Sequence, residues 1–381
     1  MPPSLFDELA PLLTQSAHRL IPGVSALLAR HWGVEVVCWL VDEKQQQLSA
    51  VQDPRRQPEP VDGSALGRSF AGQQVLSHER QGQRSLAVPI SVRGDRLGVL
   101  ELIGGDTSTL HHEDLRHLGS QLAQAIIASR RNSDVVERSR RARQMTLAAE
   151  LQWALLPGQA YADPDVSVAA LLEPAYSVAG DCYDWNRNDA SLQVVAMEGE
   201  GRGVPASLAV TLALTALRNA RRAGLALSDQ VALADQAVYA HLGGAGHVSA
   251  LVLELDLAAA TVTAVDAGSP QLHRLRDGVA SQVALEAQLP LGMFEETAYR
   301  AQTIDLVPGD RAVILTDGLY ASRLPGGDSY AEAVLANALS EARLLPATEA
   351  VRLLLRRMET GADGPEDDAL AVCLDWHLPP R

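Results

Sequence analysis

Four acidic segments, each next to an apolar run, constrain the fold of this 381-residue chain most strongly. They are 178–184 (VAGDCYD), 198–206 (EGEGRGVPA), 316–319 (TDGL) and 366–370 (EDDAL). Each places a carboxylate at the end of an apolar, β-branched run, where a strand would stop. Carboxylates gathered in one site repel and raise each other's pKa unless a cation joins them. The pattern therefore predicts a site for a hard divalent ion such as Mg²⁺ or Mn²⁺.

Composition narrows the class of protein. The length predicts about two to three domains, and a hydrophobic content of 47% with 21% charged residues is enough for packed cores. The net charge of −15 argues against a dedicated nucleic-acid binder and against an anionic membrane surface as the main partner. Aromatic residues make up only 4%, which disfavours a base-stacking surface.

The cysteines and the apolar runs indicate a cytoplasmic protein. Cys38, Cys182 and Cys373 are far apart and odd in number, so neither a disulfide framework nor a CxxC metal site is expected. No apolar run approaches the roughly 20 residues that span a bilayer. The first residues do not combine a basic segment with an apolar one, as a secretory signal does.

The N-terminal third alternates helix and strand signals. Apolar spacing predicts a helix over residues 4–31, with a break or bend at Pro22 and Gly23. Strands are predicted over 34–41 and 47–51, then mostly loop with one short helix over 52–82. Residues 85–92 and 96–102 form a hairpin around Arg93-Gly94-Asp95.

This order, and above all the VPI…G…LGVLEL hairpin, resembles a GAF domain. The resemblance implies an α/β sensor domain over residues 1–128. Two alternatives follow for its role. It binds a small-molecule ligand under the loop 55–83, or it serves dimerisation without a ligand.

Residues 110–156 are predicted to form one long helix with an interrupted heptad rhythm. The segment 129–157 would be a coiled-coil-like connecting helix that pairs with its copy in a homodimer. Six arginines lie within 130–143. A nucleic-acid-binding face is one interpretation; a solvated helix face that pairs with Asp134 and Glu137 is the favoured one.

The C-terminal part resembles the SpoIIE/RsbU-type branch of the metal-dependent protein serine/threonine phosphatases, the PPM family. That branch reads GGDxYD, D-x-SGHG-x-PA, AGH-x-P, TDG and DD-x-TL, and the four acidic segments follow this order. Further matches are 267–272 (AGSPQL), 289–292 (LPLG) and 150–157 (ELQWALLP), so the resemblance runs from about 147 to 376.

The resemblance implies an α+β fold, with an α-β-β-α sandwich over residues 158–381. Strand and helix signals fit this architecture. The predicted strands are 166–172, 192–197, 249–255, 261–265 and 312–315, and the predicted helices are 205–222, 227–242, 330–344 and 347–359.

The resemblance also implies the site. Asp181, Glu198, Asp317 and Asp367 would surround two Mg²⁺ or Mn²⁺ ions, and the flexible backbone at Gly199 would offer a carbonyl ligand. Water activated between two ions would hydrolyse a phosphoserine or phosphothreonine ester directly. By the same resemblance, the substrate would be a phosphorylated anti-sigma-factor antagonist.

Several positions depart from the family or leave a choice open. Glu198 replaces an aspartate that bridges both ions, and Mg²⁺ tolerates misplaced ligands poorly. Glu200 is an alternative ligand through a change of register, Asp368 is the alternative to Asp367, and Asp184 is expected to be structural. Ser269 stands where the family usually has histidine.

These departures support two hypotheses from different classes. The chain is a metal-dependent protein phosphatase regulated by its GAF-like domain, or it is a pseudophosphatase that works as a sensory or docking protein with impaired metal binding. A third interpretation, a DNA-binding regulator, rests on the arginine run alone.

Overall fold

The computed structural model describes residues 3–105, 107, 110–173, 176, 180–323, 328–358 and 367–378. Its contacts divide the chain into two compact units, an N-terminal unit of Met1–Gln144 and a C-terminal unit of Met145–Arg381. The domain bounds 1–128, 129–157 and 158–381 stay a prediction. Among the described residues, no helix combines the length and the apolarity needed to cross a membrane.

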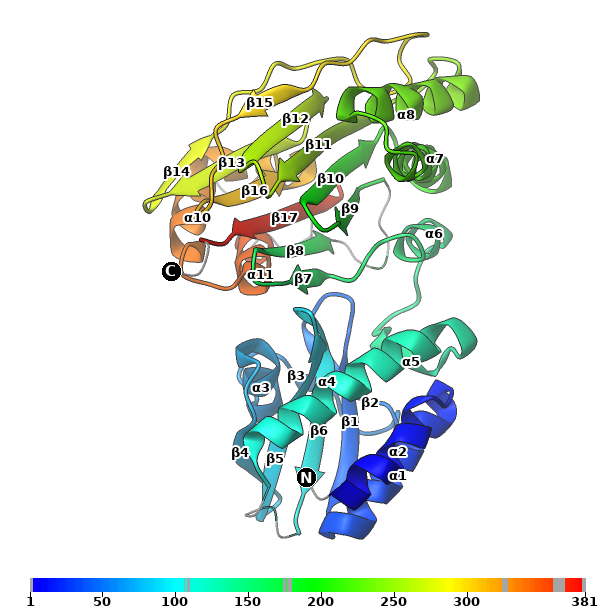
Figure 1. Cartoon of the computed structure of the whole chain (residues 1–381), viewed down its shortest axis with the longest axis vertical. Coiled ribbons are helices and arrows are strands. Elements are labelled where there is room, and N and C mark those ends of the chain that lie inside the picture. The colour runs from blue at the N-terminus through cyan, green and yellow to red at the C-terminus, as the bar shows by residue number, and fades with distance from the viewer. Residues whose placement is uncertain are drawn as a thin grey trace. The chain divides into compact units, whose positions relative to one another are not determined.

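The N-terminal unit is a six-stranded antiparallel sheet with helices packed on it (Figure 1). The strand order is β3-β2-β1-β6-β5-β4. Its elements are α1 (Pro3–Leu13), α2 (Ala17–Trp32), β1 (Glu35–Val41), β2 (Gln47–Ala50), β3 (Glu59–Pro60), α3 (Ala65–Gly72), β4 (Leu76–Arg80), β5 (Gln83–Val92), β6 (Asp95–Ile103), α4 (His112–Ser129), η1 (Arg130–Asn132) and α5 (Val135–Arg140).

The predicted hairpin is confirmed as β5 and β6. Its two-residue turn places Arg93 and Gly94 at positive φ, of 51° and 84°, as a tight hairpin turn requires. The predicted pair of 34–41 with 47–51 is confirmed as β1 and β2. The segment 52–82 contains the expected short helix α3, but β4 also lies in it and pairs with β5, which the loop-rich composition did not indicate.

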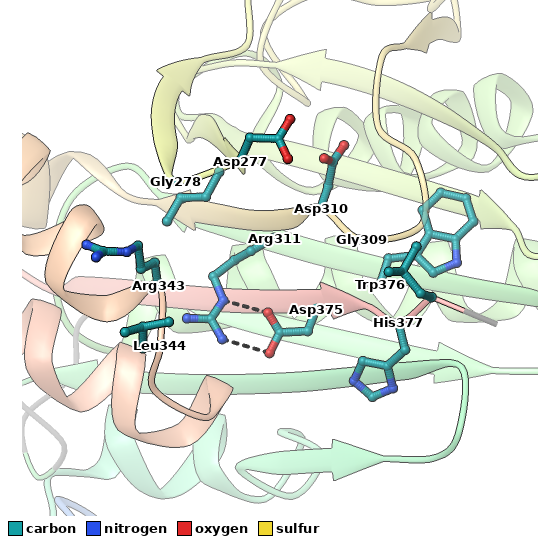
Figure 2. Close-up of a pocket in the computed structure, with 12 residues that line it drawn as sticks. Asp277, Gly278, Gly309, Asp310, Arg311, Arg343, Leu344, Asp375, Trp376 and His377 are labelled. Atoms are coloured by element: carbon teal, nitrogen blue, oxygen red, sulfur yellow. Dashed lines mark hydrogen bonds and ion pairs between the residues drawn. The ribbon is translucent and has the colours of Figure 1, made fainter. Parts of the chain in front are cut away.

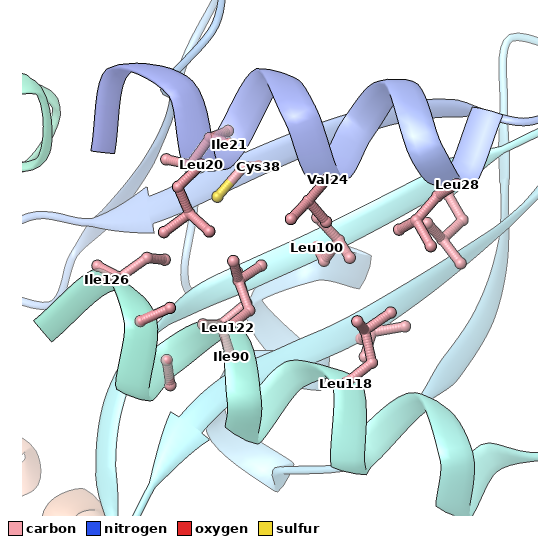
Figure 3. Close-up of a cluster of buried hydrophobic side chains, with 14 of the residues drawn as sticks. Leu20, Ile21, Val24, Leu28, Cys38, Ile90, Leu100, Leu118, Leu122 and Ile126 are labelled. Atoms are coloured by element: carbon pink, nitrogen blue, oxygen red, sulfur yellow. The ribbon is translucent and has the colours of Figure 1, made fainter. Parts of the chain in front are cut away.

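The main core of this unit lies between the sheet and the helices α2 and α4. Figure 3 shows Leu20, Val24 and Leu28 of α2 and Leu118 and Leu122 of α4 directed at the sheet. Successive apolar residues three and four apart therefore form one buried stripe on each helix.

Two predictions about helices are wrong. The helix expected over 4–31 breaks at residues 14–16 rather than at Pro22, because the turn there lets α1 fold back and bury Leu5 and Leu9 in the core. The single helix expected over 110–156 is instead α4, η1, α5 and, in the C-terminal unit, α6 (Leu147–Trp153).

The connecting segment is interrupted because its arginines find partners in the N-terminal unit. Arg140 is buried, its Nη2 lies 2.9 Å from Oε2 of Glu43, and its Nε donates to the Val41 carbonyl. Arg130 pairs with Glu137 at 2.6 Å, as the favoured interpretation expected for Glu137. A continuous helix would carry Arg140 away from Glu43, and a buried unpaired glutamate would be costly.

The C-terminal unit contains two sheets, of five and six strands. Their strand orders are β15-β12-β11-β10-β9 and β14-β13-β16-β17-β8-β7. After α6 the elements are β7 (Ala160–Ala162), β8 (Val166–Glu173), β9 (Cys182–Arg187), β10 (Ser191–Gly199), α7 (Val204–Arg222), α8 (Leu227–Leu242), β11 (Val248–Asp256), β12 (Thr261–Ala267), β13 (Gln271–Arg276), β14 (Val279–Gln282), β15 (Gln302–Ile304), β16 (Arg311–Leu315), α9 (Asp317–Tyr320), the π-helical turn η2 (Ala331–Leu335), α10 (Ala336–Ala342), α11 (Ala347–Met358) and β17 (Ala369–Trp376).

The two sheets pack face to face between two helical layers, as Figure 1 shows for α7 and α8 on one side and α10 and α11 on the other. In β10, Val194 and Ala196 belong to the core between the sheets, whereas Val195 and Met197 belong to the core under α7 and α8. Strict alternation along the strand produces this pattern. The predicted α-β-β-α sandwich is therefore confirmed.

Candidate functional site

The carboxylates of the acidic segments lie at strand ends in both sheets of the C-terminal unit. In the first sheet, Met197 near the end of β10 pairs with Cys182 at the start of β9, so Glu198, which follows Met197, lies beside Asp181, which precedes Cys182. In the second sheet, Asp317 begins α9 one residue after Thr316, which directly follows β16, and Asp367 and Asp368 directly precede the neighbouring strand β17. Hydrogen bonds between the two sheets bring these ends together.

Glu198 makes one of these bonds. Its Oε1 accepts a hydrogen bond of 2.7 Å from the backbone N–H of Asp317, and its Oε2 accepts from the hydroxyl of Ser269. Burial raises the pKa of Glu198 to about 8; the carboxylates of Asp317 and Asp367 add to the rise, and the Asp317 N–H opposes it. The longer side chain thus reaches across the sandwich from one sheet to the other.

Asp181 is the most enclosed of the predicted ligands. Only 5% of its surface is exposed, and its Oδ2 has no hydrogen-bond partner among the described residues. Burial raises the pKa of Asp181 well above its ordinary value, the carboxylates of Glu198, Asp368 and Asp317 raise it further, and the Thr316 hydroxyl lowers it. A buried carboxylate oxygen without a donor is a ready ligand for a cation.

Asp317 is held at the site by the glycine that follows it. A Cβ atom built on Gly318 would lie 1.8 Å from the carbonyl oxygen of Asp368, so only glycine permits this approach of the α9 turn to the start of β17. Burial raises the pKa of Asp317, Asp367 adds to the rise, and the N–H of Gly318 lowers it. The Thr-Asp-Gly sequence therefore places Asp317 beside Asp367.

The two adjacent aspartates at the start of β17 have different surroundings. Asp368 is buried, and its Oδ2 accepts hydrogen bonds from the N–H groups of Gly180 and Asp181, at 2.6 and 3.1 Å. Asp367 is exposed and faces Glu198 and Asp317. This arrangement favours Asp367 as the ligand and Asp368 as the group that fixes the backbone before Asp181.

The remaining positions of the 198–206 segment are also placed. Gly199 packs tightly on α7, because a Cβ there would lie 2.8 Å from Val210. Glu200 lies apart from the other carboxylates and pairs through Oε2 with Nδ1 of His247 at 2.8 Å. The arrangement supports Glu198 rather than Glu200 as the inward-facing acid.

Asp184 has a structural environment, as expected. It is buried and accepts hydrogen bonds from Arg218, at 2.7 and 3.2 Å, and from Arg221, at 3.1 Å. Two arginines of α7 therefore balance this acid, so it takes no part in the carboxylate cluster.

Several residues that support the site were not singled out from the sequence. Thr316 exchanges hydrogen bonds with the backbone of Leu370, and its hydroxyl lowers the pKa of Asp181. Gln152 donates to the carbonyl of Asp181 at 2.9 Å, and Tyr320 donates to the carbonyl of Ser269 at 3.1 Å. Thr316 and Gln152 had a signal in the sequence, because they belong to the matched segments 316–319 and 150–157. Residues 178, 179 and 366 of the predicted motifs lie outside the described residues.

The donors suit a hard divalent ion in their chemistry, since they are carboxylate oxygens and one of them, Oδ2 of Asp181, lacks a hydrogen-bond partner in the described part of the chain. Over the same residues, no three His, Cys, Asp or Glu side chains stand in the arrangement of a formed metal site. The ligand set Asp181, Glu198, Gly199, Asp317 and Asp367 thus stays a prediction.

A larger pocket, of about 660 Å³, lies at the opposite end of β16 from Asp317. Figure 2 shows Arg311 paired with Asp375 on its floor. Arg311 also donates to the carbonyls of Ala342 and Leu345. Arg311 of this pocket is therefore fully engaged with protein groups, and the pocket lies at the other end of β16 from the carboxylates.

Comparison with known proteins identifies the family. Residues 188–377 match the sequence model of the family described as stage II sporulation protein E (SpoIIE). These residues belong to the SpoIIE family. The SpoIIE domain contains β10, β16 and β17, and so holds Glu198, Asp317 and Asp367; Asp181 lies just before the matched residues.

A curated relative and two solved structures resemble the chain at low identity. The phosphoserine phosphatase RsbU of Bacillus subtilis (strain 168) is 21% identical over 185 residues, which cover 48% of this chain and 55% of that protein. The chain thus spans about half the length of this relative. The RsbU and RsbW domains of Rv1364c from Mycobacterium tuberculosis are 23% identical, with a TM-score of 0.49 over 57% of this chain and 62% of that one. The catalytic domain of the serine/threonine protein phosphatase PstP, in complex with two manganese ions, is 16% identical, with a TM-score of 0.44 over 56% and 98%.

Proposed function

We propose that this protein hydrolyses phosphoserine or phosphothreonine esters of a protein substrate, with Mn²⁺ or Mg²⁺ held by Asp181, Glu198, Asp317 and Asp367. The observation that carries the proposal is the buried Oδ2 of Asp181, which has no hydrogen-bond partner in the described part of the chain and lies among carboxylates that raise each other's pKa. Membership of the SpoIIE family supports it, as does the phosphoserine phosphatase activity in the name of the Bacillus relative.

In this reaction the residues of the chain would hold the ions and fix the positions of the ligands. Two bound ions would supply a water of lowered pKa and would stabilise charge on the attacking and leaving oxygens. Asp181 is fixed by Asp368 on its backbone N–H and by Gln152 on its carbonyl, and Asp317 is fixed by the close approach at Gly318. Rigid placement of this kind supplies the positioning that direct hydrolysis needs.

The finer parts of the proposal rest on resemblance. The substrate would be a phosphorylated anti-sigma-factor antagonist in a partner-switching pathway, and the protein would act as a homodimer in the cytoplasm. The GAF-like N-terminal unit would regulate it, through a small-molecule ligand or through dimerisation.

Phosphate release from an aryl phosphate and from a phosphoserine protein, with and without Mn²⁺, tests the activity. We expect Mn²⁺-dependent turnover in the wild type and a loss on the order of a hundredfold or more in Asp317→Asn. Asp277→Asn, which removes an acid from the exposed β13–β14 turn, is the matched control. A folded wild type without turnover at saturating Mn²⁺ would refute the enzyme.

The pseudophosphatase is the second candidate, and the contacts of Glu198 favour it specifically. Both oxygens of Glu198 already accept hydrogen bonds, from Asp317 and from Ser269. Under this alternative the wild type is inactive, and Glu198→Asp gains activity because the shorter side chain releases the Asp317 N–H. Activity of the wild type that is lower in Glu198→Asp excludes the alternative.

A further inference from the structure

A polar pocket of about 390 Å³ opens next to the carboxylate site. It is lined by the end of β12, the β12–β13 turn, the start of β13 and the segment 282–285, including Asp266, Ser269, Gln271, Gln282 and Leu285. Its volume lies in the range of small ligand sites, about 300–1,000 Å³.

The pocket and the carboxylate site share a wall. Ser269 lines the pocket, and its hydroxyl donates to Glu198. Tyr320, which follows Asp317 on α9, holds this wall in place by donating to the carbonyl of Ser269. A molecule that reaches the carboxylates can therefore extend into the pocket.

Asp266 is the acidic residue of the pocket lining. Only 8% of its surface is exposed, and its Oδ1 accepts a hydrogen bond from the N–H of Gly268 at 3.2 Å. Among the described residues, no lysine, arginine or histidine forms an ion pair with it, although most buried acids in proteins are paired. Burial raises the pKa of the Asp266 carboxyl, and the Gly268 N–H opposes the rise.

The strand pattern explains how this acid comes to face the pocket. Along β12, Ala264 belongs to the core between the sheets, whereas Val265 and Ala267 belong to the core under α8. Asp266 therefore points between the sheets, at the end where they separate around the carboxylates. The other polar side chains of the lining, Ser269, Gln271 and Gln282, carry no positive charge that would balance it.

We propose that this pocket binds a lysine or arginine side chain of the phosphoprotein, close in sequence to the phosphorylated residue, through the carboxylate of Asp266. The proposal rests on the proposed function, because it places the phosphorylated residue at Asp181, Glu198 and Asp317. An extended peptide rises about 3.3 Å per residue, so a near neighbour of the phosphorylated residue reaches the pocket past Ser269. Charge complementarity of this kind selects partners more than it adds affinity.

The experiment measures binding, so that it does not depend on turnover. Peptides carry a phosphonate analogue of phosphoserine, with lysine or the isosteric, uncharged norleucine placed at each flanking position in turn. Their affinities for the full chain in Mn²⁺ are measured by fluorescence anisotropy. At one flanking position we expect the lysine peptide to bind about tenfold more tightly than the norleucine peptide. This difference in affinity lies between the effect of an exposed charge pair and that of a buried one.

Three variants test whether the preference for the lysine peptide depends on the pocket. Asp266→Asn keeps the acceptor for Gly268 and should bind the two peptides within about twofold of each other. Gln282→Lys places a positive charge on an exposed part of the wall, where folding is not at risk, and should also remove the preference. Asp277→Asn makes the same charge change at the far end of β13 and should keep it.

The outcomes separate the two proposals. Absence of a lysine preference at every position in the wild type, or a preference that survives both pocket variants, overturns the pocket assignment. The same peptides with plain serine test the pocket without the phosphonate. A preference that depends on Asp266, in a protein that releases no phosphate from any ester, would keep the pocket and reject the phosphatase.

Discussion

Buried carboxylates of the two units have opposite neighbours. In the N-terminal unit, Glu101 is fully buried and accepts hydrogen bonds from Nε of Arg80, at 2.5 Å, and from Nε1 of Trp39, at 2.9 Å. The Arg80 guanidinium lies 5.5 Å from the centre of the Trp39 ring. In the C-terminal unit, Asp181 is nearly as buried, yet its charged neighbours are Glu198, Asp368 and Asp317.

The difference shows that the charged neighbours of a buried acid indicate whether its role is structural or functional. A carboxylate with its own arginine is complete, whereas one surrounded by other carboxylates is unfavourable until a cation arrives. Asp184, three residues after Asp181, is paired with two arginines of α7. The C-terminal unit thus pairs Asp184 with arginines and leaves the cluster around Asp181 without an arginine among the described residues, as expected at a functional site.

Among the substitutions of these buried acids, Glu101→Gln should change the free energy of unfolding most. Losing the charge leaves Arg80 partly buried without its main partner, which should lower the free energy of unfolding of the N-terminal unit by about 3 kcal/mol. Hydrogen exchange of β1 and β6 measures this loss. Glu35→Gln, which removes the exposed partner of Arg56, is the control, with an expected effect below about 0.5 kcal/mol. Equal losses in the two variants would mean that burial does not distinguish these acids.

Metal binding should affect only the C-terminal unit. At Mn²⁺ one hundredfold above its dissociation constant, the free energy of unfolding should rise by about 2.7 kcal/mol, because the ion binds the folded state. Hydrogen exchange should slow in β10 and β16 and stay unchanged in β1 and β6. Asp317→Asn should lose most of this protection. Equal protection of both units would contradict a metal site at these carboxylates.

The pH dependence of stability should differ between wild type and Glu198→Gln in EDTA. The pKa of Glu198 rises from 4.5 to about 8 on folding, so between these values the folded state holds a proton that the unfolded state releases. The contribution of Glu198 to stability should therefore be fully present below about pH 5 and fall as pH rises toward 8, by at most about 1.4 kcal/mol per pH unit. Urea unfolding across this range should show a flatter profile in Glu198→Gln. Parallel profiles would show that Glu198 is charged throughout.

Asp181→Asn should change the free energy of unfolding in the opposite direction to Glu101→Gln. Without metal, removing one charge from the cluster should raise the free energy of unfolding by about 1 kcal/mol, since the amide is not repelled by Glu198 and Asp317. Thermal melting in EDTA measures the gain. Asp184→Asn, which leaves Arg218 and Arg221 without their acid, should instead destabilise the protein. A loss of stability in both variants would remove the distinction between Asp181 and Asp184.

The sequence predicted most of what is local. Runs such as 192–197 and 249–255 predicted strands, since β-branched residues and alternation are properties of the strand itself. The fragmented segment after α4 was missed, because its breaks depend on the contact of Arg140 with Glu43, 97 positions away. β13 was also missed, since its sequence QLHRLR has only two apolar residues, which are not two apart, and so lacks the alternation of a strand.

The site shows the same division. The order of the motifs was enough to group Asp181, Glu198 and Asp317 in one site. It did not decide between Asp367 and Asp368 as the ligand, because the choice depends on which of the two side chains accepts the hydrogen bond from the Gly180 N–H. Nor did it indicate Asp266, whose strand TVTAVDA gives no sign that its acid faces a pocket without a cation. Contacts between elements distant in sequence decide these points.

The smallest effect should come from Glu200→Gln, and it settles which glutamate of the 198–206 segment belongs to the site. Glu200 is half-exposed and pairs with His247, so its loss should change stability by less than about 0.5 kcal/mol. Its removal should leave Mn²⁺ affinity within about twofold of the wild type, because its carboxylate lies apart from Asp181 and Asp317. Titration calorimetry, with Glu198→Gln as the variant expected to lose affinity, makes the measurement. If Glu200→Gln weakened Mn²⁺ binding more than Glu198→Gln, the register of the segment would shift by two residues on metal binding, and the unpaired cluster would include Glu200 in place of Glu198.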